Sequence, residues 1–309
     1  MTIPTFVRRS WHVLTLRGSR SATFLRMRLR AVHPVTFNQR LYVKMLRDRR
    51  PILTTIADKV DARGYIAEHV GEKYVCPVMA VGTHVAHIDW TSLPEEFVAK
   101  VSHGSGGQVI VTSDAREDSR LPAVVSRQGW GTLRVRPEHA DRGRIKALCQ
   151  HWLTLDYSWS PGRKAVEWCY LNVKRRVIIE PLLRDSQGLA PREYRVFVIS
   201  GRVAFIQAEL DCLGEHQTAV MSPRWQMLPV TLVDPAPTTP PPPPPRLQEM
   251  LDVALALARP LEDFIRVDFY DLGTHLLVGE LTNYPSGGQS PFSSRDYAKL
   301  WGRNWNTPY

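Results

Sequence analysis

Residues 266–288 read RVDFYDLGTHLLVGELTNYPSGG. Two acidic residues, Asp268 and Glu280, lie in otherwise apolar segments on either side of a turn predicted at 271–273. Because alternate residues of a strand share a face, an even-sum register brings both carboxylates and Arg266 to one side of a hairpin. A buried carboxylate is costly unless something pairs with it. The stretch therefore predicts either a Mg²⁺ site, which uses hard oxygen ligands, or a hairpin in which Arg266 neutralises Asp268.

The bulk composition is that of a folded soluble protein. The chain has 309 residues, 43% hydrophobic and 23% charged, which fits one large domain or two small ones. No apolar run approaches the length of a membrane span, and the N-terminus lacks the apolar segment of a signal peptide. The four cysteines form no CxxC pair and complete no zinc site, which favours reduced thiols in a cytosolic protein.

The net charge of +10 comes entirely from the N-terminal region. Residues 1–47 contain ten basic residues and no Asp or Glu, whereas residues 48–309 contain 30 basic and 30 acidic residues. The equal numbers of basic and acidic residues in 48–309 argue against nucleic-acid binding by this part of the chain, because such binding needs a basic face. The basic arm at 1–33 has three open interpretations: peripheral contact with an anionic membrane, a tail packed on its own domain, or a transit peptide.

The order of the predicted elements indicates the fold class. Hydrophobic periodicity predicts helices at 52–70, 142–156 and 246–260. Strands are predicted at 97–113 around a glycine loop, at 176–183, and in a hairpin at 193–210 that turns at Ser200-Gly201. Hairpins without regular βαβ alternation favour an α+β fold with antiparallel sheets.

A proline run interrupts this order at 234–245, DPAPTTPPPPPP. Consecutive prolines favour an extended polyproline II conformation, so we expect a stiff surface loop or spacer. A ligand for a proline-recognition domain is the alternative.

Further stretches carry possible chemistry. Lys100 precedes a glycine-rich loop at 103–107, HGSGG, whose backbone N–H groups could approach phosphate oxygens. The loop lacks the Gly-Lys-Ser/Thr of a Walker A motif, and a tight hairpin explains its glycines equally well. Glu180 lies at the end of a predicted hydrophobic strand. The backbone there could face the edge of a purine, or the chain could simply leave the strand for a loop. Glu193 and Arg195 share a strand face, which in most proteins is a surface ion pair.

The order of these stretches resembles the ATP-grasp superfamily. EPLL at 180–183 followed by EYRVFVISGRV is similar to the adenine and ribose region of D-alanine–D-alanine ligases and RimK-type ligases, and RVDFY followed by GELTNYPSGG is similar to their magnesium hairpin. The closer resemblance is to the TupA-like ATP-grasp family, named for teichuronopeptide biosynthesis. It covers approximately residues 34–305, through PVTFNQRL, IADKVDARGYI, LPEEFVAKVSHGSGG, REYRVFVISG and FIRVDFYDLGTHLLVGELTNYPSGG.

The resemblance implies an ATP-grasp fold, in which two α+β subdomains with antiparallel sheets clamp ATP between them. The basic arm would span 1–33 and a helical lead-in 34–92. The small subdomain, with the glycine-rich loop, would span 93–183. The large subdomain, with the magnesium hairpin and the inserted proline run, would span 184–309.

The resemblance also implies nucleotide-binding roles, residue by residue. Lys59 and Lys100 would contact ATP phosphates or the adenine ring, and the loop 103–107 would close over the β- and γ-phosphates. Glu180 and the backbone of Leu183 would meet adenine, and a strand glutamate would hold the ribose. The predicted nucleotide contacts are Lys100, His103, Gly104, Ser105, Gly106, Gly107, Glu180, Leu183 and Glu193.

The remaining implied roles concern phosphoryl transfer and the metal. Arg195, Arg266 and Lys59 are the predicted catalytic residues, because they would face the γ-phosphate and the acyl phosphate. Many ATP-grasp ligases end the metal motif with Glu-x-Asn, whereas this chain has Thr in the Asn position and Asn one place later, which leaves a second metal open. The predicted metal ligands are Asp268, Glu280, Thr282 and Asn283.

The implied function is an ATP- and Mg²⁺-dependent carboxylate–amine ligase that forms an amide through an acyl phosphate. The family name suggests surface-polysaccharide or peptidyl-glycan biosynthesis, in the cytoplasm or at the inner face of the membrane, with an unknown carboxylate and amine. Acceptor contacts are expected from 114–140 and 211–245. The alternatives are a phosphotransferase on the same fold, a degenerate ATP-binding scaffold, and a glycosyltransferase, for which the sequence has no DxD-like motif.

Overall fold

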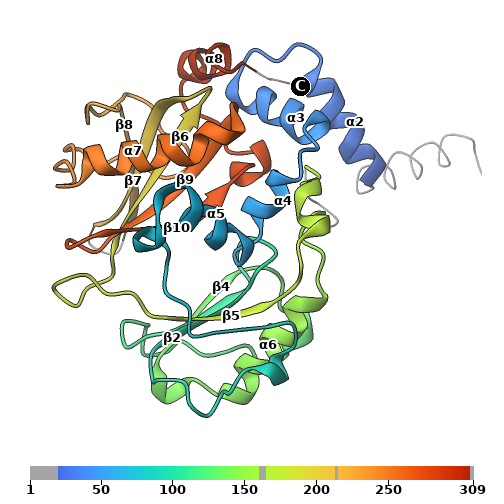
Figure 1. Ribbon diagram of the computed structural model, residues 1–309, viewed down its shortest axis with the longest axis vertical. Helices are drawn as coiled ribbons and strands as arrows, with labels where there is room; N and C mark the ends of the chain where they lie inside the picture. The colour runs from blue at the N-terminus through green and yellow to red at the C-terminus, as the bar shows by residue number, and fades with distance from the viewer. Residues whose placement is uncertain (1–19, 160–164, 213–214, 307–309) are drawn as a thin grey trace, which may run out of the picture.

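The computed structural model describes residues 20–159, 165–212 and 215–306, and its elements form two lobes, each built on a five-stranded sheet (Figure 1). The larger sheet has the order β10-β9-β6-β7-β8 and is antiparallel throughout. The smaller sheet has the order β1-β5-β2-β3-β4, and only its β3–β4 pair is parallel. The predicted α+β class with antiparallel-rich sheets is confirmed.

The elements have the following bounds. The smaller sheet contains β1 (Ala80–Gly82), β2 (Phe97–Val101), β3 (Gln108–Val111), β4 (Thr132–Val135) and β5 (Val177–Pro181). The larger sheet contains β6 (Arg192–Ile199), β7 (Arg202–Cys212), β8 (Glu215–Met221), β9 (Phe264–Asp271) and β10 (Leu276–Thr282). The α-helices are α2 (Arg20–Ala31), α3 (Phe37–Arg47), α4 (Ile52–Ala57), α5 (Asp61–Val70), α6 (Arg142–Thr154), α7 (Leu247–Ala258) and α8 (Arg295–Arg303).

Local sequence accounts for the central hairpin of the larger sheet. Ser200 and Gly201 both have positive φ, 47° and 73°, which is the two-residue turn whose twist matches that of paired strands. The predicted hairpin with its turn at these residues is therefore confirmed. Helix α7 packs across β6, β7 and β9, and α6 covers the smaller sheet at β2.

The single helix predicted at 52–70 is wrong, because the structure has two helices, α4 and α5, with a break at 58–60. The Asp58 carboxylate accepts a hydrogen bond from the Val60 N–H (2.9 Å), a local turn that competes with helix continuation. Arg176 also pairs with Asp58 and holds the break in place. The break matters for function because it contains Lys59.

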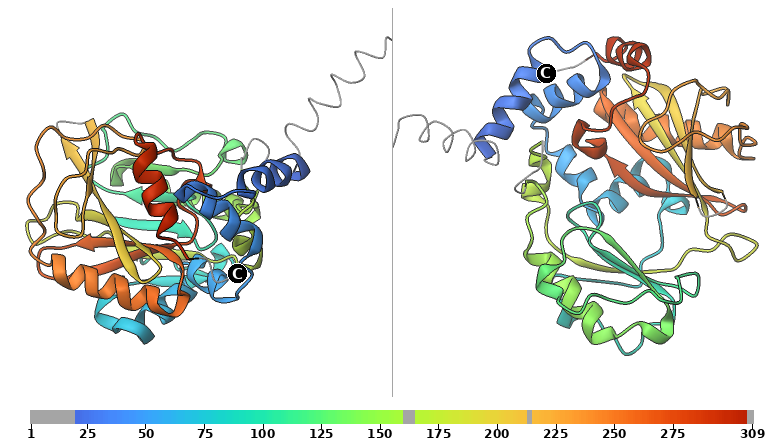
Figure 2. Two further views of the ribbon diagram at one scale, coloured as in Figure 1. Left: turned by 90° about the horizontal axis from the view of Figure 1, so that it is seen from above. Right: turned by 180° about the vertical axis from the view of Figure 1, so that it is seen from behind.

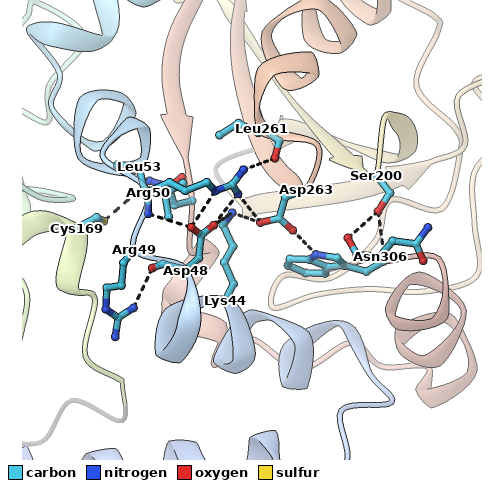
Figure 3. A network of polar contacts seen from close by, with 12 residues as sticks. Lys44, Asp48, Arg49, Arg50, Leu53, Cys169, Ser200, Leu261, Asp263 and Asn306 are labelled. Carbon is cyan, nitrogen blue, oxygen red and sulfur yellow. Dashed lines mark hydrogen bonds and ion pairs between the residues drawn. The ribbon is translucent and has the colours of Figure 1, made fainter. Parts of the chain in front are cut away.

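A buried charge network fixes the start of β9 to α3 (Figure 3). Lys44 in α3 pairs with Asp48 (3.4 Å) and with Asp263, and all three side chains have no exposed surface. Arg50 adds a second cation on Asp48 (2.7 Å), and the Trp305 indole N–H donates to Asp263. Asp263 directly precedes β9, so the network anchors the strand that carries the opening motif.

The smaller sheet, the proline run and the N-terminal helix each differ in detail from a simple division of the chain. The smaller sheet starts at β1 and so recruits residues before 93, while the predicted boundaries themselves stay a prediction. Residues 234–245 form a loop without helix or strand, tied down by the Trp225 indole N–H, which donates to the Pro241 carbonyl (2.9 Å). Part of the predicted arm forms α2, which packs on α3, and residues 1–19 lie outside the described residues. None of the described helices has the length and apolarity needed to cross a membrane.

Candidate active site

The β9–β10 hairpin carries the two acidic residues as a directly opposed pair. The register places Asp268 opposite Glu280 and Arg266 opposite Thr282, so the prediction that both carboxylates share one face is confirmed. A bulge between Val278 and Glu280 makes this register possible.

The bulge contains Gly279, and the residue type is required there. A Cβ at this position would lie 2.5 Å from the ring of Tyr270, which packs directly over the glycine. The sequence motif thus sets the pairing of the carboxylates through one glycine.

The same face continues across the larger sheet as a row of polar side chains. Arg195 in β6 is paired with Asp268 on one side and with Gln207 of β7 on the other. Directly opposed residues of antiparallel strands point to the same side, so Gln207, Arg195, Asp268 and Glu280 form one row. Four strands therefore contribute to one charged stripe, and the arginine that the sequence offered as a surface ion pair lies at its centre.

The charges of this stripe pair with one another. Arg266 holds Asp268 through two hydrogen bonds, Nε to Oδ1 at 2.6 Å and Nη2 to Oδ2 at 2.5 Å. Lys59 Nζ lies 2.8 Å from Glu280 Oε1. Arg195 Nη1 lies 2.9 Å from Glu209 Oε1, and its Nε is 3.9 Å from Asp268 Oδ2. The salt-bridged hairpin, which was one of the two predicted alternatives, is present, and the same side chains present the oxygens that the other alternative needs.

The two paired carboxylates have opposite pKa shifts. Burial alone would raise the pKa of Glu280, but the Lys59 ammonium and the Arg266 guanidinium outweigh it and lower the pKa to about 2. Burial raises the pKa of Asp268 and outweighs the opposing effect of Arg266, and the nearby charge of Glu280 acts in the same direction. One carboxylate is therefore held ionised while its neighbour gains a proton more readily.

A second ion pair approaches from the smaller lobe. Lys100 of β2 pairs with Glu180 of β5 at 2.7 Å, and each side chain is at most 16% exposed. Burial would lower the pKa of Lys100, but the Glu180 carboxylate outweighs burial and raises it. These two residues line the same small cavity, about 20 Å³, as Lys59 and Glu280. The structure thus brings two predicted lysines and two predicted carboxylates from both lobes to one place.

The glycine-rich loop is built around its glycines. Gly104, Gly106 and Gly107 have positive φ values of 151°, 77° and 62°, which favour glycine. Added Cβ atoms would collide with Tyr157, Gly131 and Trp130 respectively. Lys59 Nζ donates to the Gly104 carbonyl, which connects the loop to Glu280 of the hairpin.

Two of the other loop residues have different surroundings. His103 is buried, and a ring nitrogen lies 3.2 Å from the Leu155 carbonyl. Burial lowers the pKa of His103 to about 4, so the ring is neutral at pH 7 and contributes no positive charge for phosphate. Ser105 is exposed. His103 therefore anchors the loop, while Ser105 and the backbone are its accessible parts.

Leu183 and Glu193, which are predicted to contact adenine and ribose, have partners in the larger lobe. Leu183 follows β5 and packs against a small apolar cluster of Cys76, Leu272 and Leu277. Glu193 lies 3.4 Å from Arg195, with 40% of its side chain exposed. The pKa of Glu193 is raised by burial, against the opposing effect of Arg195.

The oxygen atoms on this strand face fit a Mg²⁺ ion. Thr282 Oγ1 is buried, has no hydrogen-bond partner, and lies on the strand face of Glu280. Asn283 Nδ2 donates to the Leu53 carbonyl (2.8 Å), while its Oδ1, like Thr282 Oγ1, is buried without a hydrogen-bond partner. No group of three or more His, Cys, Asp or Glu side chains in the described part of the chain could hold a metal unaided. Two carboxylates and a hydroxyl fit a Mg²⁺ that completes its shell with water and phosphate oxygens.

A larger pocket, about 210 Å³, is lined by Arg195 and Arg266. Its residues come from six separate segments, and only Arg195 and Arg266 among them had an individual role predicted from the sequence. Asn38 lay within the quoted PVTFNQRL, and residues 232–234 fall in the range 211–245 from which acceptor contacts were expected. The pocket is lined by Phe37, Asn38, Arg195, Phe197, Gln207, Leu232, Val233, Asp234, Arg266, Pro285, Ser286, Ser290 and Phe292.

The shape of this pocket depends on the end of the opening motif. Ser286, Gly287 and Gly288 all have positive φ, so the chain turns sharply after Pro285. The Asn38 side-chain amide donates to the carbonyls of Gly288 (3.0 Å) and Ser290 (2.9 Å) and holds the turn against α3. The sequence PSGG thus forms one wall of the pocket.

The chain forms two lobes, each built on one sheet, and paired lysines, arginines and carboxylates lie where the lobes meet. This is the arrangement of the ATP-grasp class of α+β proteins. A family model described as TupA-like ATPgrasp matches residues 39–305, and the chain belongs to that family. The family and the fold predicted from the order of the motifs are both confirmed by this match.

Solved structures with similar chains were also found. PsnB, an ATP-grasp ligase complexed with a minimal precursor, is 10% identical with a TM-score of 0.39, covering 75% of this chain and 53% of its own. A D-alanine–D-alanine ligase from Bacillus anthracis complexed with ATP is 14% identical with a TM-score of 0.39, covering 75% and 57%. The Helicobacter pylori D-alanine–D-alanine ligase is 13% identical with a TM-score of 0.38, covering 76% and 53%. This chain spans about half the length of these proteins, and no curated protein matches it.

Proposed function

We propose that this protein is an ATP-dependent carboxylate–amine ligase that forms an amide through an acyl phosphate. The observation that carries the proposal is the meeting of Lys59, Lys100, Glu180 and Glu280 at one cavity, while Arg266, which lines a larger pocket with Arg195, lies 3.9 Å from Glu280. These charges suit a nucleoside triphosphate at the small cavity and its acceptor in the larger pocket.

The chemistry proceeds in two steps. An oxygen of the substrate carboxylate attacks the γ-phosphorus of ATP, the bond to the β-phosphate oxygen breaks, and ADP leaves. The amine then attacks the acyl carbon, inorganic phosphate leaves, and the nitrogen loses a proton. Little of this needs covalent participation of the protein, so positioning and charge neutralisation carry the catalysis.

The residues of the chain have defined parts in this scheme. Asp268 and Glu280, with Thr282, would hold Mg²⁺, which would neutralise charge on the phosphate groups. Arg195, Arg266 and Lys59 would stabilise the charge on the transferred phosphoryl group. The loop 103–107 would cover the phosphates and exclude water from the acyl phosphate.

The larger pocket would hold the acceptor. Arg195 and Arg266 line it, so a substrate carboxylate placed there would face the transferred phosphoryl group. Phe37, Phe197 and Phe292 form apolar walls, and Asp234 supplies an opposite charge for an amine. The setting we propose is surface-polysaccharide or peptidyl-glycan synthesis, in the cytoplasm and in peripheral contact with an anionic membrane through residues 1–33.

The proposal is tested by thermal unfolding with ATP alone, Mg²⁺ alone and both together. A ligand at a hundredfold excess over its Kd stabilises the native state by about 2.7 kcal/mol. For 309 residues at about 2.1 cal/mol/K each, this corresponds to a rise in Tm of about 4 °C. We expect that rise in the wild type and its loss in Asp268→Asn.

The matched control is Asp252→Asn on the exposed side of α7, which should keep the full rise. No rise in the wild type, or an equal rise in both variants, would refute the nucleotide site. A screen of carboxylates with hydroxylamine then identifies the reaction type, because hydroxylamine traps an acyl phosphate as a hydroxamate. ADP release without hydroxamate would favour the phosphotransferase alternative.

A further inference from the structure

Helix α2 has one face fixed to the body of the protein. Thr23 and Met27 are 2% and 0% exposed, and the Val166 N–H donates to the Met27 sulfur at 3.3 Å. Arg30 Nη1 donates to the Tyr42 hydroxyl (2.8 Å), and its guanidinium lies over the Tyr42 ring. These contacts fix the rotation of the helix about its own axis.

The opposite face of α2 is apolar and exposed. Leu25, Leu29 and Val32 are 59%, 66% and 60% exposed. At 100° per residue Leu25 and Leu29 lie about 40° apart and point away from Thr23 and Met27, and Val32 follows directly after the end of the helix at Ala31. Figure 2 shows α2 at the outer edge of the molecule, away from both sheets. Two leucines of a fixed helix and a valine at its C-terminal end therefore form an exposed aliphatic surface.

The charges beside this aliphatic surface are all of one sign. Arg26 and Arg28 flank it on its two sides and are exposed, and neither forms an ion pair in the described part of the chain. Residues 1–47 contain no Asp or Glu, so no acidic residue of this region offsets them. An apolar stripe bordered by arginines is the pattern of a helix that lies in the plane of an anionic bilayer surface.

We propose that the surface formed by Leu25 and Leu29 of α2 and by Val32 directly after the helix, with Arg26 and Arg28 at its borders, binds an anionic lipid surface. A nucleic-acid backbone would use the arginines but not the aliphatic side chains between them. A second copy of the chain would place identical arginines against each other in a two-fold interface, which is repulsive. The lipid headgroup layer satisfies both the charge and the aliphatic surface.

The position of this face fits the acceptor pocket. Only residues 32–36 separate α2 from α3, and the first residues of α3, Phe37 and Asn38, line the pocket beside Arg195. A protein seated through α2 would therefore hold this pocket near the lipid surface, where a lipid-linked acceptor would present its reactive group. This last step rests on the proposed ligase function, whereas the membrane contact does not.

The test is co-sedimentation of the full chain with vesicles of equal parts phosphatidylglycerol and phosphatidylcholine, compared with vesicles of phosphatidylcholine alone. We expect binding to the anionic vesicles only. Leu25→Ser combined with Leu29→Ser should weaken it at least tenfold. Arg26→Gln combined with Arg28→Gln should weaken it about 25-fold at low salt, at about fivefold per arginine, and less at high salt.

Matched controls exist for both pairs of substitutions. Leu189→Ser removes a leucine with the same 59% exposure as Leu25. Arg202→Gln combined with Arg224→Gln removes two exposed charges elsewhere. Both controls should bind as the wild type does, and all variants should keep its Tm.

Failure of the wild type to bind anionic vesicles, or equal binding by the α2 variants and the controls, would overturn the proposal. So would dimerisation that depends on Leu25 and Leu29, or binding to DNA that depends only on Arg26 and Arg28. The Tm shift with Mg-ATP is measured on the same samples. Vesicle binding without that shift would overturn the proposed ligase function and leave the membrane contact standing. A Tm shift without vesicle binding would overturn the membrane contact and leave the ligase function standing.

Discussion

Replacing Lys44 by methionine should destabilise this protein more than any surface substitution. Methionine keeps the length of the side chain but removes the charge that Asp48 and Asp263 share, and all three side chains have no exposed surface. Arg50, whose side chain is 34% exposed, would be the remaining cation at both carboxylates. Removing one partner of a buried ion pair typically costs about 3–5 kcal/mol, because a charge is left buried without compensation.

That cost converts into a shift that can be measured. At about 2.1 cal/mol/K per residue, 309 residues give an unfolding entropy of about 0.65 kcal/mol/K, so Tm should fall by about 5–8 °C. Differential scanning calorimetry measures this directly. Arg47→Met removes a charge from the exposed side of the same helix, and its Tm should stay within about 1 °C of the wild type. A Lys44→Met variant as stable as Arg47→Met would refute the role given to the network.

Three further predictions concern the candidate site. Lys59→Met should raise the rate of amide hydrogen exchange in the loop 103–107, because the contact from Lys59 Nζ to that loop is lost. Gly279→Ala should cost about 1–3 kcal/mol of stability in urea denaturation, because the new methyl group collides with the partly buried ring of Tyr270. The stabilisation by Mg-ATP should disappear as pH falls through the raised pKa of Asp268, above its ordinary value of 3.8, because a metal ligand must be ionised. Thermal unfolding from pH 7 downward measures that loss.

Each of these predictions has its own control. Lys146→Met on the exposed face of α6 should leave the amide exchange of the loop 103–107 unchanged. Gly64→Ala in α5, where the new methyl group meets no atom within 4 Å, should be neutral or stabilising.

Without ligand, Asp268 and Glu280 contribute to stability with opposite dependence on pH. The lowered pKa of Glu280 gives stability that is present above its ordinary value of 4.5 and is lost as pH falls toward about 2. The raised pKa of Asp268 gives stability that is present below 3.8 and is lost as pH rises. Mg-ATP stabilisation unchanged through this range would contradict the role given to Asp268.

The sequence could predict the hairpin because its signals are local. Asp271-Leu272-Gly273 marked the turn, and alternation puts Asp268 and Glu280 on one face if the register is even, a condition that the bulge at Gly279 fulfils. The hairpin at Ser200-Gly201 and the glycine loop were predictable for the same reason, since positive φ at consecutive residues favours few residue types.

Features that depend on distant residues could not be predicted. Lys44 looked like one more charge of the basic region 1–47, and only the fold places it against Asp263, 219 residues away. The break between α4 and α5 depends on Asp58, whose turn competes with a helical pattern that otherwise continues. The acceptor pocket combines six segments, and although several of them lie in quoted motifs, nothing local in the sequence indicates that they surround one cavity.

The pairing of charges within the site explains why nucleotide and metal should bind as one ligand. ATP alone would take the cations Lys59 and Arg266 from their partners and leave two carboxylates unpaired. Mg²⁺ alone would take the carboxylates and leave the cations close together without counter-ions. Only Mg-ATP supplies both partners at once, so that each side chain exchanges one opposite charge for another. The Tm rise with both ligands should therefore exceed the sum of the two separate rises, and this excess measures the exchange.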